Sequence, residues 1–262
     1  MIKGLSFDSV LWGLTFSLNV ALIVLLFIRK NHRVLPLFSL YVFLDFVHGL
    51  VVFESYRIWG FTSYQSMNIA WSTQGVVTVA RALAVAEICH HILAKFRGVW
   101  RLAWRTLVAA AAFVFLYSWA ASRGRWQLAI LNVDRGLELA IASSLVLLFL
   151  FAKYYEVAVQ LALRTLATGF FLYSGFRVLN DTILERWLHR YATLWNLFGT
   201  VTFLATLLLW IWALRLTQQQ DASEPTLLSV DHYRSLSPAI NARLKSLNER
   251  LSHFWHAEGG KT

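Results

Sequence analysis

The chain has 262 residues, of which 58% are hydrophobic and only 15% are charged. Soluble domains are about 45–50% apolar and about 25% charged, so this composition argues against a soluble fold and for a bilayer protein. The formal net charge is +10, and all of the excess lies in residues 1–215, because residues 216–262 carry equal numbers of acidic and basic side chains. Basic loops beside anionic lipid account for this charge, so we expect the lipid bilayer as a partner and no nucleic acid.

Long apolar stretches separated by short polar segments fill the first four fifths of the chain. A helix that crosses a bilayer needs about 20 predominantly apolar residues. The pattern predicts an all-α, polytopic membrane domain over residues 1–215 with seven transmembrane helices, at 8–28, 34–54, 68–92, 102–121, 127–151, 157–179 and 192–214.

The basic residues beside the first stretch predict the orientation of the domain. Arg29, Lys30 and Arg33 follow this stretch, whereas Lys3 alone precedes it. Because cytoplasmic loops are enriched in Lys and Arg, we expect the N-terminus outside and the C-terminus in the cytoplasm. The expected location is the inner (plasma) membrane.

The last 47 residues have a different character. Residues 216–236 are polar and predict a linker, and residues 237–262 predict a short amphipathic cytoplasmic tail helix. Its apolar stripe consists of Ile240, Leu244, Leu247, Leu251 and Phe254. The stripe fits a second copy of the chain, a cytoplasmic protein partner, the membrane surface or this protein's own loops, and we expect the tail to be dispensable for folding.

One group of ionisable residues lies at or outside the middle of the predicted spans. Such side chains cost about 2.5–3.5 kcal/mol each at mid-depth, so they should face the bundle interior and find partners. The group is predicted to join the second, third and fifth helices, with a direct Asp45–Arg81 ion pair near mid-membrane. It can be a ligand pocket, a proton or ion path, or a purely structural ion-pair network, and it consists of Asp45, His48, Arg81, Asp134, Arg135 and Glu138.

A second polar group lies near the cytoplasmic ends of the helices and consists of Glu87, His90, His91 and Arg164. The segment EICHH has carboxylate and imidazole at metal-binding spacing, but one helix supplies too few ligands. We therefore expect no metal and predict that Glu87 pairs with Arg164. His48 and His91 differ in predicted depth by about 22 Å, so they cannot share one haem, and no other cofactor is expected.

Five segments carry a resemblance: RKNHR after the first helix, the Asp45 region, EICHH, DRGLEL on the fifth helix, and RLKSLNERL in the tail. With these features the chain resembles a group of bacterial seven-helix membrane proteins, which implies an architecture and no activity. The layout is also similar to bacterial membrane sensor domains, at the level of the fold alone.

Three function hypotheses follow from these patterns. The first is a membrane sensor or interaction module whose buried polar cluster detects a ligand and whose tail relays to a partner. The second is a small-solute or proton-coupled transporter, although no inverted repeat or Gly/Pro-broken helix pair is visible. A membrane enzyme is third, because no nucleophile–base pair or metal-ligand set is present, and no catalytic residue is proposed.

Overall fold

The computed structural model describes residues 7–60, 63–94, 96–155, 157, 159–180, 192–222, 238 and 241–250. Within these ranges the chain is helical and forms no strand. The elements before the tail are α1 (Phe7–Ile28), the short 3₁₀ helix η1 (Asn31–Arg33), α2 (Pro36–Trp59), α3 (Tyr64–Leu93), α4 (Arg97–Ala121), α5 (Trp126–Tyr154), α6 (Leu161–Leu179) and α8 (Ala192–Ala222).

Local sequence explains several helix ends. Pro36 is the first residue of α2, where its missing N–H costs nothing. Gly60 ends α2 with a φ of 80°, a left-handed value that favours glycine. Ser63 caps α3 by accepting a hydrogen bond from the backbone N–H of Gln65 at 3.3 Å. The long helices are thus divided by residues that stop one helix and start the next.

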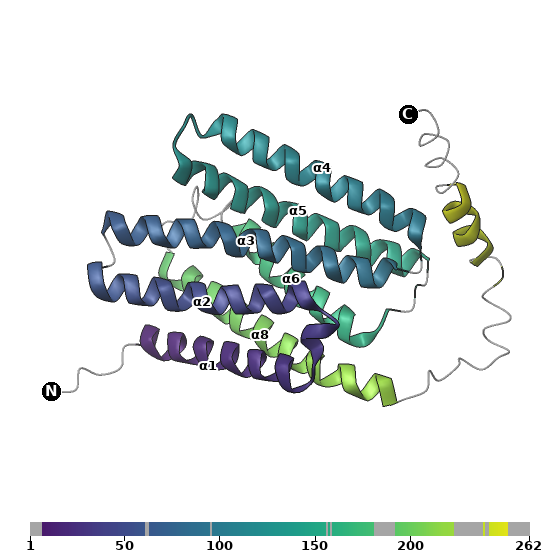
Figure 1. The fold of residues 1–262 in the computed structure, drawn as a ribbon, viewed down its shortest axis with the longest axis horizontal. Coiled ribbons are helices and arrows are strands. Elements are labelled where there is room, and N and C mark those ends of the chain that lie inside the picture. The colour runs from purple at the N-terminus through teal and green to yellow at the C-terminus, as the bar shows by residue number, and fades with distance from the viewer. Residues whose placement is uncertain are drawn as a thin grey trace.

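The helices run along a common direction and give the bundle two ends (Figure 1). We name the end with the α2–α3 connection at residue 60 the loop-60 end, and the α4–α5 connection lies there too. We name the end with the α1–α2 connection, residues 29–35, the loop-30 end. The α3–α4 and α5–α6 connections and the C-terminus of α8 also lie at the loop-30 end.

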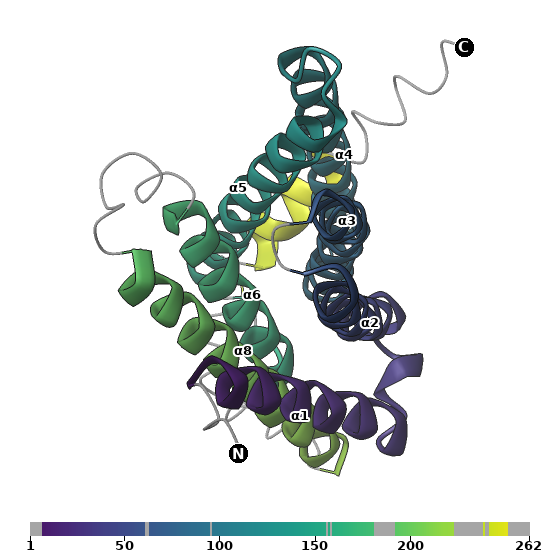
Figure 2. The same cartoon turned by 90° about the vertical axis from the view of Figure 1, so that its left-hand side faces the viewer.

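Six helices form a ring, and α4 lies outside it. Each helix of the ring contacts the next in the order α1, α2, α3, α5, α6 and α8, and α8 contacts α1. Figure 2 shows this arrangement along the helix axes, with α4 at the edge beside α5 and α3. The inner faces of the ring therefore meet one another, whereas α4 has a large exposed apolar surface.

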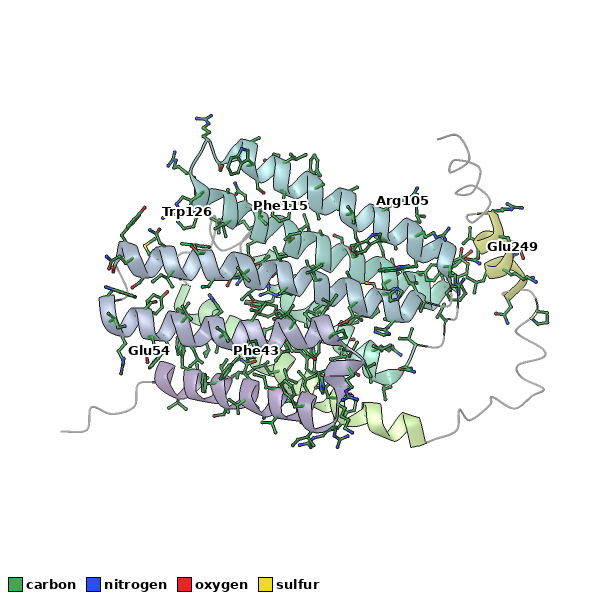
Figure 3. The ribbon with its side chains drawn as sticks, in the orientation of Figure 1. Phe43, Glu54, Arg105, Phe115, Trp126 and Glu249 are labelled. Atoms are coloured by element: carbon green, nitrogen blue, oxygen red, sulfur yellow. The ribbon has the colours of Figure 1, made fainter. Side chains whose placement is uncertain are left out.

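Six helices of the described chain, α1 to α5 and α8, are long and apolar enough to cross a membrane. Exposed apolar side chains such as Phe43 and Phe115 lie on the outer surface, about midway between the two ends of the bundle (Figure 3). The charged Glu54 lies near the loop-60 end. The 19-residue α6 does not reach the same apolarity, because it contains Arg164, Arg177 and several small polar residues. The chain is thus a helical bundle suited to a membrane, and a seventh span stays a prediction.

An aromatic cluster fills the ring toward the loop-30 end. We call it the aromatic plug, and it consists of Phe38, Tyr41, Phe170 and Trp210, all fully buried. The rings of Phe170 and Trp210 are 4.7 Å apart, and Trp210 Nε1 donates to the Leu166 carbonyl at 3.2 Å. Gly169 permits this packing, because a Cβ there would lie 2.5 Å from Trp210 Nε1.

The tail contacts the bundle at the loop-30 end. Residues 241–250 are helical, Leu244 is buried, and the Asn248 side chain accepts a hydrogen bond from the Gly98 N–H at 2.8 Å. Gly98 lies in the first turn of α4, where backbone N–H groups have no partner within the helix. Of the tail hypotheses, docking on this protein's own bundle is the contact observed. Helix α8 continues past Arg215 to Ala222, and residues 223–237 and 251–262 lie outside the described residues.

A polar cavity in the helix ring

A cavity of about 500 Å³ lies inside the ring, in the half near the loop-60 end. Its walls come from α1, α2, α3, α6 and α8. Its polar lining is Thr15, Asn19, Asp45, His48, Gln74, Arg81, Arg177, Asn180 and Thr200. Its aromatic lining is Trp12, Phe16, Phe46, Tyr173, Phe176 and Phe203. The cavity is large enough for a small organic molecule and offers charged, hydrogen-bonding and apolar surface together.

Arg81 forms the floor of the cavity and is held from several sides. Its guanidinium pairs with the Glu138 carboxylate of α5, and the two side chains are 1% and 0% exposed. The guanidinium carbon also lies 4.7 Å from the centre of the Tyr173 ring and 5.6 Å from that of Tyr41. Because Tyr41 belongs to the aromatic plug, Arg81 marks the boundary between the cavity and the plug.

A second ion pair joins α5 to α6. Arg177 of α6 pairs with the buried Asp134 of α5. The Asp134 carboxylate also accepts hydrogen bonds from the hydroxyl of Thr78 and from the side-chain amide of Gln74, both on α3. Asp134 is therefore satisfied by three side chains from two helices, while the same Gln74 and Arg177 also face the cavity.

Asp45 differs from the other carboxylates of the cluster. It lines the cavity, Asn19 of α1 is its hydrogen-bonding neighbour, and no ion pair reaches it within the described residues. The predicted Asp45–Arg81 ion pair is wrong, because Arg81 pairs with Glu138 instead. Helical spacing and depth put Arg81 near both acids, and they do not decide between carboxylates on two adjacent helices. Asp45 and Arg81 nevertheless face the same space.

His48 and Arg135 complete the predicted group. His48 Nδ1 lies 2.7 Å from the Thr73 hydroxyl oxygen. Since that hydroxyl donates to the Ile69 carbonyl, we assign Nδ1–H as the donor, which leaves Nε2 as an acceptor toward the cavity. Arg135 is half-buried on α5 beside Asp134 and is not part of the cavity lining.

Glu87 caps a helix, and its predicted pairing with Arg164 is wrong. Its two carboxylate oxygens accept from the backbone N–H groups of Leu37, at 3.1 Å, and Phe38, at 2.8 Å. These residues occupy the first turn of α2, where the N–H groups lack helical partners and the helix dipole favours an anion. A carboxylate from a neighbouring helix therefore replaces the side-chain cap that Leu35 cannot supply.

The other three members of the second group, His90, His91 and Arg164, each make different contacts. His91 Nε2 is 3.1 Å from the Val34 carbonyl, and the His90 ring lies 4.7 Å from that of Trp100. Arg164 lines a different cavity, between α5 and α6. The EICHH segment therefore links α3 to the start of α2, and the described residues contain no cluster of three or more His, Cys, Asp and Glu side chains that could hold a metal ion.

Arg177, Tyr173 and Gln74 are cavity residues that the sequence patterns did not single out. Arg177 lies near the end of its span, and basic residues at span ends are ordinarily counted as flanking charges. A signal was present, because Asp134 and Arg177 both lie on the outer side of the predicted midplane, about 6 Å apart in depth, which a long arginine side chain can span. Tyr173 precedes Arg177 by four residues and therefore shares its helix face.

The cavity can hold a small solute by hydrogen bonds and charge at Asp45, His48 and the two arginines, and by ring contacts from Trp12 and Phe16. Comparison with protein-family models, with curated proteins and with solved structures finds no match to this chain.

Proposed function

We propose that this protein is a membrane sensor or binding module for a small solute with a polar or ionisable head and an apolar body. The observation that carries the proposal is the cavity of about 500 Å³ in which Asp45, His48, Arg81 and Arg177 face a shared space lined with aromatic rings. Buried charge in a bilayer is costly, and a cavity wall is a place where it can contact a ligand.

The aromatic plug favours sensing over transport. Phe38, Tyr41, Phe170 and Trp210 are fully buried between the cavity and the loop-30 end. A transported solute has to pass this cluster, whereas a sensed solute binds and leaves from one side. Transport by the same cavity is the second candidate, and it requires the plug to open.

A route from the cavity to the tail is part of the proposal. Arg81 lies on α3, which ends at Leu93, and Phe96 is the N-cap of α4. The tail docks on the first turn of α4 through Asn248. A ligand that shifts α3 would therefore alter the tail dock and change access of a cytoplasmic partner or second copy to the tail.

The proposed setting is the inner (plasma) membrane, with all seven long helices across it, the N-terminus outside and the C-terminus in the cytoplasm. The charges after α1 and the apolarity of six helices support this arrangement. Reporter fusions within residues 55–65 and after Arg215 test it. A periplasmic signal from the fusion after Arg215 would overturn the orientation.

The binding proposal is tested by ligand-induced thermal stabilisation of the purified protein across a panel of amines, carboxylates and zwitterions. We expect at least one class to raise the melting temperature of the wild type. Asp45→Asn should abolish the shift, and Glu54→Gln, on the same helix but outside the cavity, should keep it. Uptake of the same compound into liposomes that contain the protein would show that the protein is a transporter and not a sensor. If no class of compound raises the melting temperature, the binding proposal is wrong.

A further inference from the structure

A second cavity, of about 380 Å³, lies at the loop-30 end between α5 and α6. Lys153 lines it from the last turn of α5, and Arg164 lines it from the first turn of α6. No acidic residue is among the described residues that line it. This cavity shares no lining residue with the polar cavity described above.

The two cations have no ion-pair partner within the described part of the chain. The ion pairs of the described chain join Arg57, Arg81, Arg177 and Lys245 to acids, and none of them involves Lys153 or Arg164. Neither side chain makes a hydrogen bond within the described part of the chain. Both side chains are exposed. Two like charges that border one small space, with no acid among its described lining residues, attract an anion to it.

The start of α6 adds to this positive potential. Its N-cap, Gln160, makes no side-chain capping hydrogen bond. The first N–H groups of a helix carry partial positive charge and favour a negative group nearby, and a cation in the first turn is otherwise unfavourable there. Arg164 occupies that unfavourable position, which a bound anion would relieve.

The other walls identify the molecule that carries the anion. Ile92, Leu148, Phe149 and Val159 give the cavity an apolar surface beside the two cations. Because α5 is long and apolar enough to cross a membrane, we expect its end at Tyr154, and the start of α6 beside it, at the level of the headgroups. We propose that this cavity binds the phosphate of an anionic phospholipid, with Lys153 and Arg164 on the phosphate and the apolar wall against an acyl chain.

Native mass spectrometry of the full chain, purified in a neutral detergent, tests the proposal. The protein is titrated with phosphatidylglycerol and with phosphatidylcholine of the same acyl chains, and separately with inorganic phosphate. The double variant Lys153→Gln/Arg164→Gln is compared with Arg33→Gln/Arg101→Gln, which removes two cations that are equally exposed but do not line the cavity.

We expect the wild type to retain phosphatidylglycerol in preference to phosphatidylcholine. The Lys153/Arg164 double variant should bind phosphatidylglycerol about tenfold more weakly, because it loses two charge contacts with the phosphate. The Arg33/Arg101 double variant should bind within about twofold of the wild type.

Three results would overturn the proposal. Equal weakening in both double variants would show that the attraction is spread over the surface. Equal retention of the two lipids by the wild type would remove the phosphate contact. Saturation by inorganic phosphate alone, with displacement of the lipid, would make the site a phosphate-ion site. Circular dichroism of both variants establishes that they are folded.

Discussion

The two halves of the helix ring bury charge in different ways. Toward the loop-60 end, Arg81, Glu138, Asp134 and Arg177 form ion pairs around a cavity. Toward the loop-30 end, the interior is aromatic and aliphatic, and its buried carboxylate, Glu87, is satisfied by backbone N–H groups. A charged group that only joins two helices, such as Glu87, can be satisfied by backbone N–H groups. The charged groups that line the cavity, Arg81 and Arg177, are held by carboxylates of α5 and can still contact a ligand.

The largest effect should come from breaking the ion pair on the cavity floor. Glu138→Gln leaves Arg81 charged and buried, and removing one partner of a buried pair costs about 3–5 kcal/mol. The double variant Arg81→Met/Glu138→Leu should recover part of this loss. Chemical denaturation in detergent gives the free energies of unfolding.

The exposed pair Arg57–Glu54, at the loop-60 end of α2, is the matched control. Glu54→Gln should lower the free energy of unfolding by no more than about 0.5 kcal/mol, because exposed pairs contribute little. Similar losses for Glu54→Gln and Glu138→Gln would show that the buried Arg81–Glu138 pair contributes no more to the free energy of unfolding than an exposed pair does.

The next effect tests the helix cap in the other half. Glu87→Ala removes the acceptor of two N–H groups of α2 and should cost about 2–3 kcal/mol, since hydrogen bonds to charged groups are the stronger ones. Glu87→Gln retains one oxygen and should cost about half as much. The ligand-induced shift measured for the polar cavity should persist in both variants. Loss of that shift would mean that the two halves are coupled more tightly than their contacts indicate.

A smaller effect tests the aromatic plug. In Gly169→Ala the new Cβ meets Trp210 Nε1, and overpacking of this kind costs about 1–2 kcal/mol. Gly175, on the same helix, has no atom within 4 Å of a built Cβ, so Gly175→Ala should be neutral or stabilising. Thermal unfolding of the pair measures the difference, and an equal response would show that the plug is loosely packed.

The smallest effect concerns the tail. Asn248→Ala removes a cap from the first turn of α4 and should cost about 1 kcal/mol. Lys245→Ala, on the same tail helix and largely exposed, should be near neutral. Truncation after Ala222 should leave the bundle folded, as measured by its melting temperature. Unfolding of the truncated chain would show that the tail is part of the core.

Sequence patterns predicted the helices better than their partners. Apolar length placed the span ends within about five residues of the observed helix ends, except that α8 continues to Ala222, eight residues past the predicted end. Several of the observed ends follow local signals such as Pro36 and Gly60. The depth of a charge along its helix was also informative, since Arg81 and Glu138 share the predicted mid-depth and form a pair.

Partner choice depended on information that the sequence does not carry. The rotation of α2, α3 and α5 about their own axes decides whether Arg81 meets Asp45 or Glu138. The sequence pattern does not give this rotation. Glu87 was assigned to Arg164 because charges are expected to pair with charges. Its actual partners are backbone N–H groups, which every residue except proline has and which therefore leave no signal in the sequence.

The Glu87 cap also constrains how the chain is assembled during synthesis. Glu87 follows Leu37 by 50 residues, so α2 leaves the ribosome before the carboxylate that completes its first turn exists. Until α3 arrives, two polar N–H groups of α2 need water or headgroups, and in lipid such groups are costly. The two helices should therefore enter the bilayer as one hairpin, and a chain cut between them should insert α2 poorly.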